Sequence, residues 1–433
     1  MNIKYTFIIA AIILINTSCS SRLNEMVIDK NQYRDQLEGF WLGQCIANWT
    51  GLITEGDKIG IPVDGKGGGF YTRENWGGID HPNIWGSNNY SETIDFIYAA
   101  KDSIWGADDD TDIEYMYQEL LIENNTLFLD GEQIRAGWLN HIYKNEENYL
   151  WVSNQRAFDL MQEGIVPPDT SDPKNNPFYE MIDAQLTTEI FGLFSPGRAD
   201  IALELAYLPI RTTAKYDAEW ISNFYVTMHS LASIVSDTLT MNEKILWLSN
   251  EARKELPDSS YSAKMYDFIY ASYSNNPDKN NWEKTRDEIY ERYQLNSNDG
   301  YIYNQPFDAG INYSASLISL FYGAGNLLRT IQIGTLCGWD SDNPTATWGG
   351  LLGFMLGKRG VESIFNKNDF SDAYWIHRTR KNFPDHTEDI EGEDTFHLMA
   401  KRGIQIIDRI VIEQIKGGVD LKNDVWYIPL KEN

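Results

Sequence analysis

Small residues recur at every fourth position near the start of the chain, and this spacing constrains the fold more than any other feature. The residues at this spacing are Gly39, Gly43, Ala47 and Gly51. Residues four apart lie one above another on a helix, so they form one face without side-chain bulk. The backbone of a second helix can approach such a face closely. A second glycine-rich stretch, 349–357, has the same character, and the sequence therefore predicts helices in close contact.

Helical periodicity continues through most of the chain. In the stretch 113–121, apolar residues recur with the spacing of an amphipathic helix, whereas the period-two alternation of strands is scarce throughout. Further helices are expected at 200–208, 220–235, 281–293, 314–337 and 395–415. We predict an all-α fold with a single multi-helical domain over 36–433, and the 42% hydrophobic content supplies a core for it.

The N-terminus has the pattern of an export signal. The apolar run Tyr5–Ile15 is too short to span a bilayer comfortably, and it predicts a signal peptide over 1–19. A small residue directly before Cys19 resembles the lipobox of bacterial lipoproteins, although Asn16 stands where an aliphatic residue is usual. We expect lipidation of Cys19, with cleavage without lipid as the alternative, and then a polar tether over 20–35. The protein would be an exported periplasmic or outer-membrane lipoprotein.

The chain is strongly acidic. Lys and Arg number 36 against 63 Asp and Glu, which gives a formal charge of −27. Such a surface repels phosphate backbones and anionic lipid, so we expect no nucleic-acid partner and membrane contact only through the lipid anchor. General solubility explains most of this charge, but it leaves room for clustered carboxylates that bind cations.

Cysteine and histidine usage argues against a zinc site. Cys45 and Cys337 remain after the predicted lipidation site, and they form either a disulfide or two buried thiols. The six histidines show no i, i+4 pair, and neither an HExxH nor a CxxC motif occurs.

Two long irregular segments interrupt the helices, at 56–91 and 164–178. Segments this long in a compact domain are usually functional or disordered. The first carries or adjoins several aromatic residues, and for each of them we expect a place in the core ahead of stacking on a sugar or base ring. These aromatic residues are Tyr71, Trp76, Trp85, Tyr90 and Trp105.

Three consecutive carboxylates, Asp108, Asp109 and Asp110, precede a predicted helix. Thr111 and Glu114 fit an S/T-x-x-E capping box, so this helix is expected to begin at or just after Thr111. The helix dipole favours acidic residues at such a place, but three in a row repel one another unless a cation neutralises them. The turn is therefore a candidate metal site.

A second acidic turn carries Asp340 and Asp342, with Asn343 as the expected helix cap and Pro344 at the first helical position. Because Asp340 and Asp342 are two residues apart, both carboxylates can point toward one place, as a hard cation requires. Two such turns from distant parts of the chain favour a shared two-metal site. Glu55 follows the small-residue helix, and alone it would be an ordinary surface glutamate.

The order and spacing of these elements resemble the ADP-ribosylglycohydrolase family, of the dinitrogenase-reductase-activating glycohydrolase type. The GDxxGxxxE helix end of that family is matched by 47–55, its T-D-D-T turn by 108–111 and its GGDTDT-type turn by 338–343. The stretch 192–206 also resembles the middle region of the family. The similarity covers roughly 37–360.

The resemblance implies an all-α domain that holds two Mg²⁺ or Mn²⁺ ions. Family members hydrolyse the bond between ADP-ribose and a protein side chain or small acceptor. By position, Asp109, Asp110 and Asp342 would be metal ligands, and Asp340 would bind the second ion. Glu55 matches the active-site glutamate of the family.

Some positions depart from the family pattern. Asp108 and Asn343 replace threonines that ligate metal, and both side chains still offer oxygen ligands. Asn48 stands where the family has aspartate, and Trp339 stands where it has glycine. We expect both of these residues to line the substrate pocket, and we expect Trp339, the largest steric change, to reshape it.

A hypothesis for the reaction follows from the resemblance. The ions would hold vicinal sugar hydroxyls and activate a water for attack on the anomeric carbon, with Glu55 as base or acid. Because ADP-ribosylated proteins are mainly intracellular, an exported member could instead be a glycoside hydrolase that acts on glycans. A third reading is a non-catalytic sugar-binding lipoprotein that inherited the fold.

Overall fold

The computed structural model describes residues 25–87, 91–106, 109–143, 152–377, 380–388 and 392–429. The predicted signal peptide with Cys19 lies outside these residues, as do Asp108 and Tyr90.

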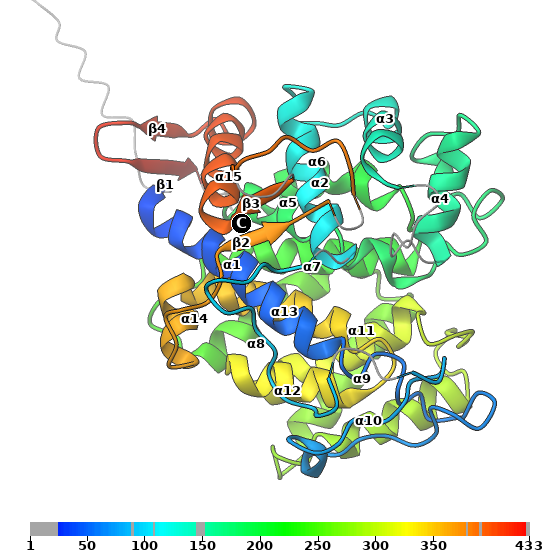
Figure 1. Cartoon of the computed structure of the whole chain (residues 1–433). Helices are drawn as coiled ribbons and strands as arrows, with labels where there is room; N and C mark the ends of the chain where they lie inside the picture. The colour runs from blue at the N-terminus through cyan, green and yellow to red at the C-terminus, as the bar shows by residue number, and fades with distance from the viewer. Residues whose placement is uncertain are drawn as a thin grey trace, which may run out of the picture.

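Helices dominate the described residues, and a few short strands accompany them (Figure 1). The helices are α1 (Lys30–Gly51), α2 (Asp109–Glu123), α3 (Gly131–His141), α4 (Val152–Gln162), α5 (Ile190–Phe194), α6 (Ala199–Ile210), α7 (Asp217–Ala232), α8 (Met241–Ala252), α9 (Tyr261–Asn275), α10 (Glu283–Ile289), α11 (Ala309–Gly323), α12 (Leu327–Cys337), α13 (Asp342–Leu356), α14 (Lys358–Ile364) and α15 (Phe396–Ile410). The strands are β1 (Glu25–Asp29), β2 (Ala373–Trp375), β3 (Glu393–Thr395), β4 (Gly418–Asp420) and β5 (Val425–Pro429). The all-α fold class is confirmed, because the strands form only a three-stranded and a two-stranded sheet beside the helices.

Helices α1 and α13 pack backbone against backbone. A Cβ added at Gly43 would collide with the carbonyl oxygen of Gly349, and one added at Gly51 would collide with the backbone of Asp342. Later residues of α1 therefore contact earlier residues of α13, so the two helices are antiparallel. The predicted stripe of small residues is the surface of α1 that makes this contact.

The central position of the α1–α13 pair determines where the candidate site residues lie. In Figure 1, α1 crosses the middle of the molecule, with α2, α3 and α15 above it and α9, α10 and α12 below it. Because the helices are antiparallel, the C-terminal end of α1 and the loop after it lie at the N-terminal end of α13. The loop that carries Glu55 and the turn that carries Asp340 are thus brought to the same end of one helix pair.

The folded part of the chain begins earlier than the sequence predicts. Strand β1 pairs antiparallel with β5, with Glu25 opposite Pro429 and Asp29 opposite Val425. The Asp29 carboxylate also caps α1 by accepting the backbone N–H of Gln32 at 2.8 Å. The tether prediction is therefore wrong from residue 25 onward, because a five-residue strand shows no pattern that can be recognised without its distant partner.

The helix predicted at 314–337 is two helices, α11 and α12. Between them the backbone turns at Ala324 and Gly325, whose φ angles are 52° and 78°. Left-handed backbone of this kind ends a helix. Asn326 then caps α12 by accepting the backbone N–H of Arg329 at 3.0 Å. Apolar periodicity on both sides of the turn conceals this break in the sequence.

Several smaller expectations can be compared with the described residues. Tyr71 and Trp105 are buried, as expected for aromatic residues of the core, but Trp85 is 47% exposed. Cys45 and Cys337 are both buried and are not joined by a disulfide, which leaves the alternative of two thiols. In the described part of the chain, every helix is either too short or too polar to cross a membrane.

We expect Gly43→Ala to lower the free energy of unfolding by about 3 kcal/mol, because the new methyl group meets the backbone of Gly349 and forces α1 and α13 apart. Equilibrium denaturation measures this loss. Gly403→Ala on α15 is the matched control, since Gly403 is also buried and helical. A Cβ there meets only side-chain atoms, the nearest from Leu37 at 3.2 Å, and the better helix propensity of alanine offsets that contact. Equal losses in the two variants would contradict the backbone contact.

Candidate active site

The second acidic turn and the loop after α1 meet at one place. Carboxylate oxygens of Glu55, Asp340 and Asp342 all lie within 4.8 Å of one another. Asp340 and Asp342 are buried, and Glu55 is half-buried. These three side chains, which come from distant parts of the sequence, are called the carboxylate cluster below.

Backbone hydrogen bonds hold the acidic turn against the loop after α1. The N–H of Gly56 donates to the carbonyl oxygen of Trp339 at 3.0 Å, and the N–H of Trp339 donates to that of Lys58 at 2.8 Å. Gly338 has a φ of 106° and lies so near Lys58 that a Cβ would be 2.6 Å from its carbonyl oxygen. Only glycine satisfies both conditions, so Gly338 fixes the approach of the two segments.

Helix α2 brings the first acidic turn to the same place. Asp110 is buried, and its two carboxylate oxygens accept the side-chain N–H groups of Asn48 at 2.8 Å and Asn343 at 3.2 Å. Asp109 is close enough to Asp340 that its charge contributes to raising the pKa of Asp340. The structure therefore brings both acidic turns and the end of α1 together.

The capping box predicted for α2 is wrong. The helix begins at Asp109 instead of at Thr111, so Asp109 and Asp110 lie in its first turn. Glu114 does not reach back to the start of the helix. Its two oxygens accept the side-chain N–H of Gln44 and the backbone N–H of Ile190, both at 2.7 Å. A buried carboxylate needs such partners, and the demand of the core overrides the local capping pattern.

The predicted start of α13 is also displaced. The helix begins at Asp342 with Ser341 at its cap, so Asn343 and Pro344 lie within its first turn. Asn343 is therefore not the cap. Its side-chain N–H donates to Asp110, and its side-chain oxygen accepts from Gln185 at a long 3.5 Å.

Crowded negative charge is the main electrostatic property of the carboxylate cluster. The pKa of Asp340 is raised well above its ordinary value, first by burial and then by the charges of Asp342 and Glu55. Like charges this close are stable together only when a proton or a cation lies between them. The donor set of the cluster consists of carboxylate oxygens, which suit a hard divalent cation such as Mg²⁺ or Mn²⁺.

The two residues predicted to line the substrate pocket are buried instead. Trp339 has no exposed surface, its indole N–H donates to the side-chain oxygen of Gln294 at 2.7 Å, and its ring centroid lies 5.0 Å from that of Phe70. Asn48 is 1% exposed and holds Asp110. A substrate cannot touch either side chain in this conformation. The indole is buried because Gln294 and Phe70 supply it with a polar and an apolar partner.

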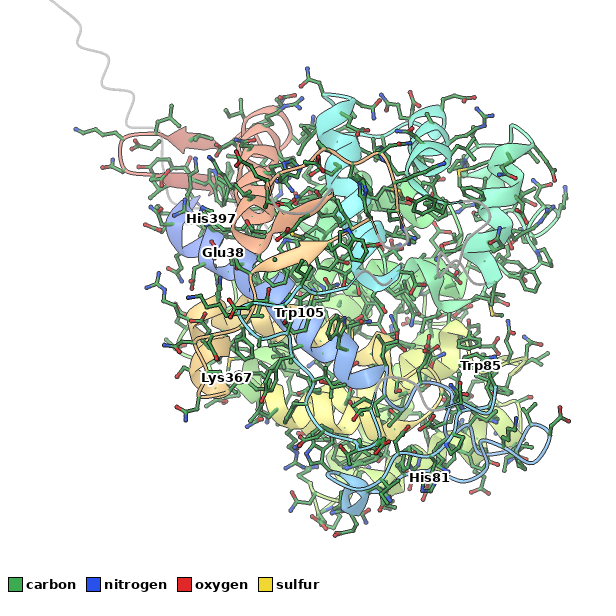
Figure 2. All side chains as sticks on the ribbon, viewed as in Figure 1. Glu38, His81, Trp85, Trp105, Lys367 and His397 are labelled. Atoms are coloured by element: carbon green, nitrogen blue, oxygen red, sulfur yellow. The ribbon has the colours of Figure 1, made fainter. Side chains whose placement is uncertain are left out.

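Two further residues support or border the cluster: Asn312, which sequence reasoning missed, and Trp85, for which it favoured a place in the core. Asn312, inside α11, accepts the backbone N–H of Asp340 on its side-chain oxygen at 3.1 Å, and a helix interior gives no local signal for this. Trp85 lies beside the loop that carries Glu55, because a Cβ on Gly56 would be 3.2 Å from the Trp85 ring. Its ring lies nearly parallel to that of Phe307, with centroids 6.1 Å apart, and Figure 2 shows it at the periphery of the molecule.

A buried carboxyl pair ties α2 to α13 behind the site. Glu114 and Glu189 are 0% and 1% exposed and are hydrogen-bonded to each other. Thr347 on α13 donates to Glu189 at 2.7 Å. Burial raises the pKa of both carboxyls, that of Glu189 to about 7. One proton is therefore retained between them at neutral pH.

Comparisons with known proteins cover most of the chain. A family model described as ADP-ribosylglycohydrolase matches residues 29–399. No match was found among curated proteins. Among solved structures, a chain from an "ADP-ribosylglycohydrolase-related protein complex" is similar at 13% identity and a TM-score of 0.49, covering 87% of this chain and 98% of that one. The family model spans every residue of the carboxylate cluster.

We expect Glu189→Gln to change how stability depends on pH. The pKa of Glu189 is raised in the folded state from its ordinary value of 4.5 to about 7, so the folded protein binds more protons than the unfolded chain in that interval. The wild type should therefore lose stability as the pH rises from about 4.5 through about 7, by about 2–3 kcal/mol from Glu189. The glutamine variant should lose less stability over this interval, because only the raised pKa of Glu114 still contributes. Denaturation at a series of pH values measures it.

Glu132→Gln is the control for that experiment, because the Glu132 side chain is 73% exposed. A stability difference between wild type and Glu189→Gln that does not vary with pH would contradict the burial of an ionisable pair.

Proposed function

The chain belongs to the ADP-ribosylglycohydrolase family, and on this premise we propose that it is a divalent-cation-dependent hydrolase of an ADP-ribosyl or related N- or O-glycosidic bond. One observation carries the proposal beyond the family's general hydrolase character. Three carboxylates, Glu55, Asp340 and Asp342, lie within 4.8 Å of one another where a structural role would call for fewer charges.

The proposed cation site combines both acidic turns. We place two Mg²⁺ or Mn²⁺ ions on the oxygens of Asp109, Asp110, Asp340 and Asp342, with Asp108 and Asn343 as further donors. Bound ions would supply positive charge that lowers the pKa of a water and holds vicinal hydroxyls of a sugar. The chain's own contribution is alignment, since Asn48 and Asn343 orient the Asp110 carboxylate through their side-chain N–H groups.

Glu55 is the proposed acid–base residue. It belongs to the carboxylate cluster but comes from a separate loop, and it is more exposed than Asp340 and Asp342. It is therefore the carboxylate of the cluster that a substrate reaches most easily. In this position the Glu55 carboxylate can accept a proton from an attacking water, or its protonated form can donate one to the leaving group.

A glycan is the second candidate substrate, and the surroundings of Glu55 favour it. Trp85 is 47% exposed next to Gly56, and Phe307 lies parallel to its ring. An exposed indole beside a glycosidic-bond site offers an apolar face to a sugar ring. We propose, with the lipidation of Cys19, that the protein is exported, and export would give it access to glycans.

The cation site predicts saturable binding. Calorimetric titration of Mg²⁺ and Mn²⁺ into the protein without its signal peptide should show about two ions per chain, and the double variant Asp110→Asn, Asp342→Asn should lose this binding. The matched control is Asp237→Asn, Asp258→Asn, which removes the same charge from side chains that are 103% and 95% exposed. The proposed cation site would be contradicted if the wild type bound no cation, or if the two double variants bound it equally.

The acid–base role predicts a loss of turnover without a loss of fold. At saturating cation, Glu55→Gln should lower kcat by about 10²- to 10⁴-fold on an ADP-ribosylated peptide or on an aryl glycoside, whichever the wild type cleaves. Unchanged turnover would exclude Glu55 from the reaction. If the wild type cleaves neither substrate in the presence of cation, hydrolysis of these two bond classes is contradicted, and the alternative of a sugar-binding protein that kept the fold without the reaction is favoured.

A further inference from the structure

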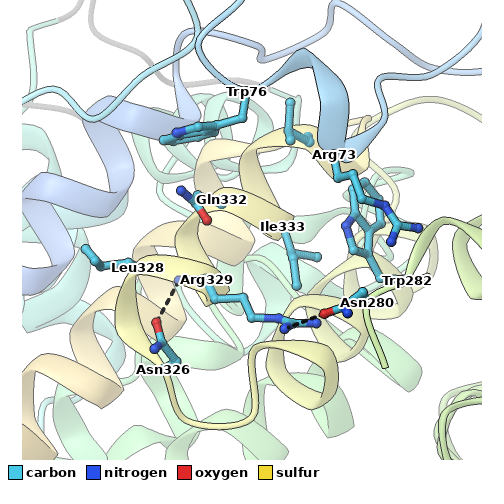
Figure 3. A pocket seen from close by; sticks show the side chains of 10 residues that line it. Arg73, Trp76, Asn280, Trp282, Asn326, Leu328, Arg329, Gln332 and Ile333 are labelled. Atoms are coloured by element: carbon cyan, nitrogen blue, oxygen red, sulfur yellow. Dashed lines mark hydrogen bonds between the residues drawn. The ribbon is translucent and has the colours of Figure 1, made fainter. Parts of the chain in front are cut away.

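A pocket lies outside the carboxylate cluster, between the 73–76 segment, the loop before α10 and helix α12 (Figure 3). Its volume is about 430 Å³, which falls in the range of small-molecule sites. None of the residues that line it belongs to the cluster. The lining residues are Arg73, Trp76, Asn280, Trp282, Asn326, Leu328, Arg329, Gln332, Ile333 and Leu336.

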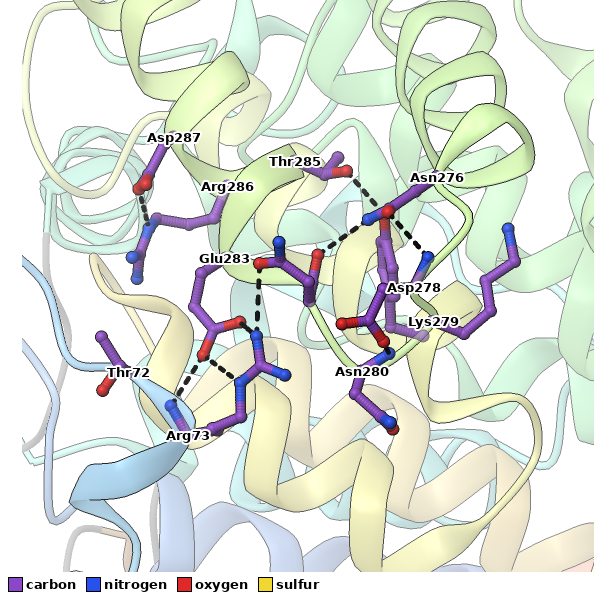
Figure 4. Close-up of polar contacts among 12 residues, drawn as sticks. Thr72, Arg73, Asn276, Asp278, Lys279, Asn280, Glu283, Thr285, Arg286 and Asp287 are labelled. Carbon is purple, nitrogen blue, oxygen red and sulfur yellow. Dashed lines mark hydrogen bonds and ion pairs between the residues drawn. The ribbon is translucent and has the colours of Figure 1, made fainter.

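The charge of this lining is opposite to that of the whole chain. It contains two arginines and no carboxylate, in a protein that has 63 acidic and 36 basic residues. Arg73 is neutralised from behind by Glu283, which it contacts through two guanidinium N–H groups at 2.9 and 2.6 Å (Figure 4). Arg73 is thereby fixed in place, and its net charge is balanced.

Arg329 carries a positive charge that is not balanced in this way. Its guanidinium donates to the side-chain oxygen of Asn280 at 3.0 Å and to the backbone carbonyl of Lys279, and both acceptors are neutral. In the described part of the chain it forms no ion pair with a carboxylate. It also lies in the first turn of α12, where the helix dipole adds positive potential. The pocket therefore presents a fixed, uncompensated cation to a ligand.

The other walls suit a ring that carries hydroxyl groups. Trp76 and Trp282 lie on either side of the pocket in Figure 3, and Trp76 is held by an edge-on contact with Phe96, with ring centroids 4.8 Å apart. The amide of Gln332 lies between Trp76 and Arg329 and makes no hydrogen bond to any described residue. An indole face, a planar amide and a guanidinium match the apolar face, hydroxyl groups and anionic group of an acidic sugar.

We propose that this pocket binds a carboxylated sugar unit, with its carboxylate on Arg329, a hydroxyl on Gln332 and one ring face on Trp76. Neither the family activity nor the cation site requires such a pocket. The proposal makes the protein a binder of acidic glycans at a place separate from the bond that it cleaves.

The test is calorimetric titration with D-glucuronate, D-glucose and benzoate. Glucuronate should bind, glucose should bind at least about tenfold more weakly because it lacks the anion, and benzoate should bind at least about tenfold more weakly because it lacks the hydroxyl groups. Arg329→Gln should weaken glucuronate binding by at least about tenfold and leave glucose binding unchanged. Arg359→Gln is the matched control, since it removes a positive charge whose side chain is 85% exposed on α14.

Two further variants separate this pocket from the active site and from damage to the fold. Gln332→Leu breaks no hydrogen bond to a described residue, so it should keep the melting temperature and still weaken glucuronate binding. Asp110→Asn, Asp342→Asn should bind glucuronate as well as the wild type does, whether or not the proposed reaction occurs. The proposal is overturned if glucuronate does not bind, if benzoate or glucose binds equally well, or if binding follows the aspartates instead of Arg329.

Discussion

The backbone contact between α1 and α13 is the constraint on which the rest of the molecule depends. Gly43 lies against the backbone of Gly349, so the two helices are as close as main chains allow. The same contact runs on to Gly51, which lies against the backbone of Asp342. The helix that presents Asp342 and the helix that leads to Glu55 are thus one rigid unit. Helix packing therefore brings the carboxylate cluster together, and backbone hydrogen bonds between the loop after α1 and the turn before α13 hold it in place.

Placing so many carboxylates on this unit costs stability, and the surroundings of the cluster limit that cost. The Asp110 carboxylate accepts hydrogen bonds from the side-chain N–H groups of Asn48 and Asn343. These two neutral donors stabilise its negative charge. Asn48 lies on α1 and Asn343 on α13, so the carboxylate that α2 presents is bound by both helices of the central pair.

Sequence patterns predicted the parts of this structure that depend on short-range spacing. The small-residue stripe, the end of α1 before Glu55 and the acidic turns all follow from residues a few positions apart. Several of the errors share one cause, which is a partner far away in the chain. Strand β1 exists because β5 pairs with it, Glu114 leaves its cap because Gln44 and Ile190 bind it, and Trp339 is buried because Gln294 accepts its indole N–H. The pocket around Arg329 could not be predicted from the sequence, because three separate segments build it.

The pairing of β1 with β5 places the first and last described residues, Glu25 and Pro429, directly opposite each other. Topologically the domain is close to a closed ring, since a short linker between those strands would cost little loop-closure entropy. The helices could therefore follow one another along the chain from a different starting point and still pack in the same way. A circularly permuted chain, opened in the exposed connection between α7 and α8 and joined across this sheet, keeps α1 against α13 and so keeps the site.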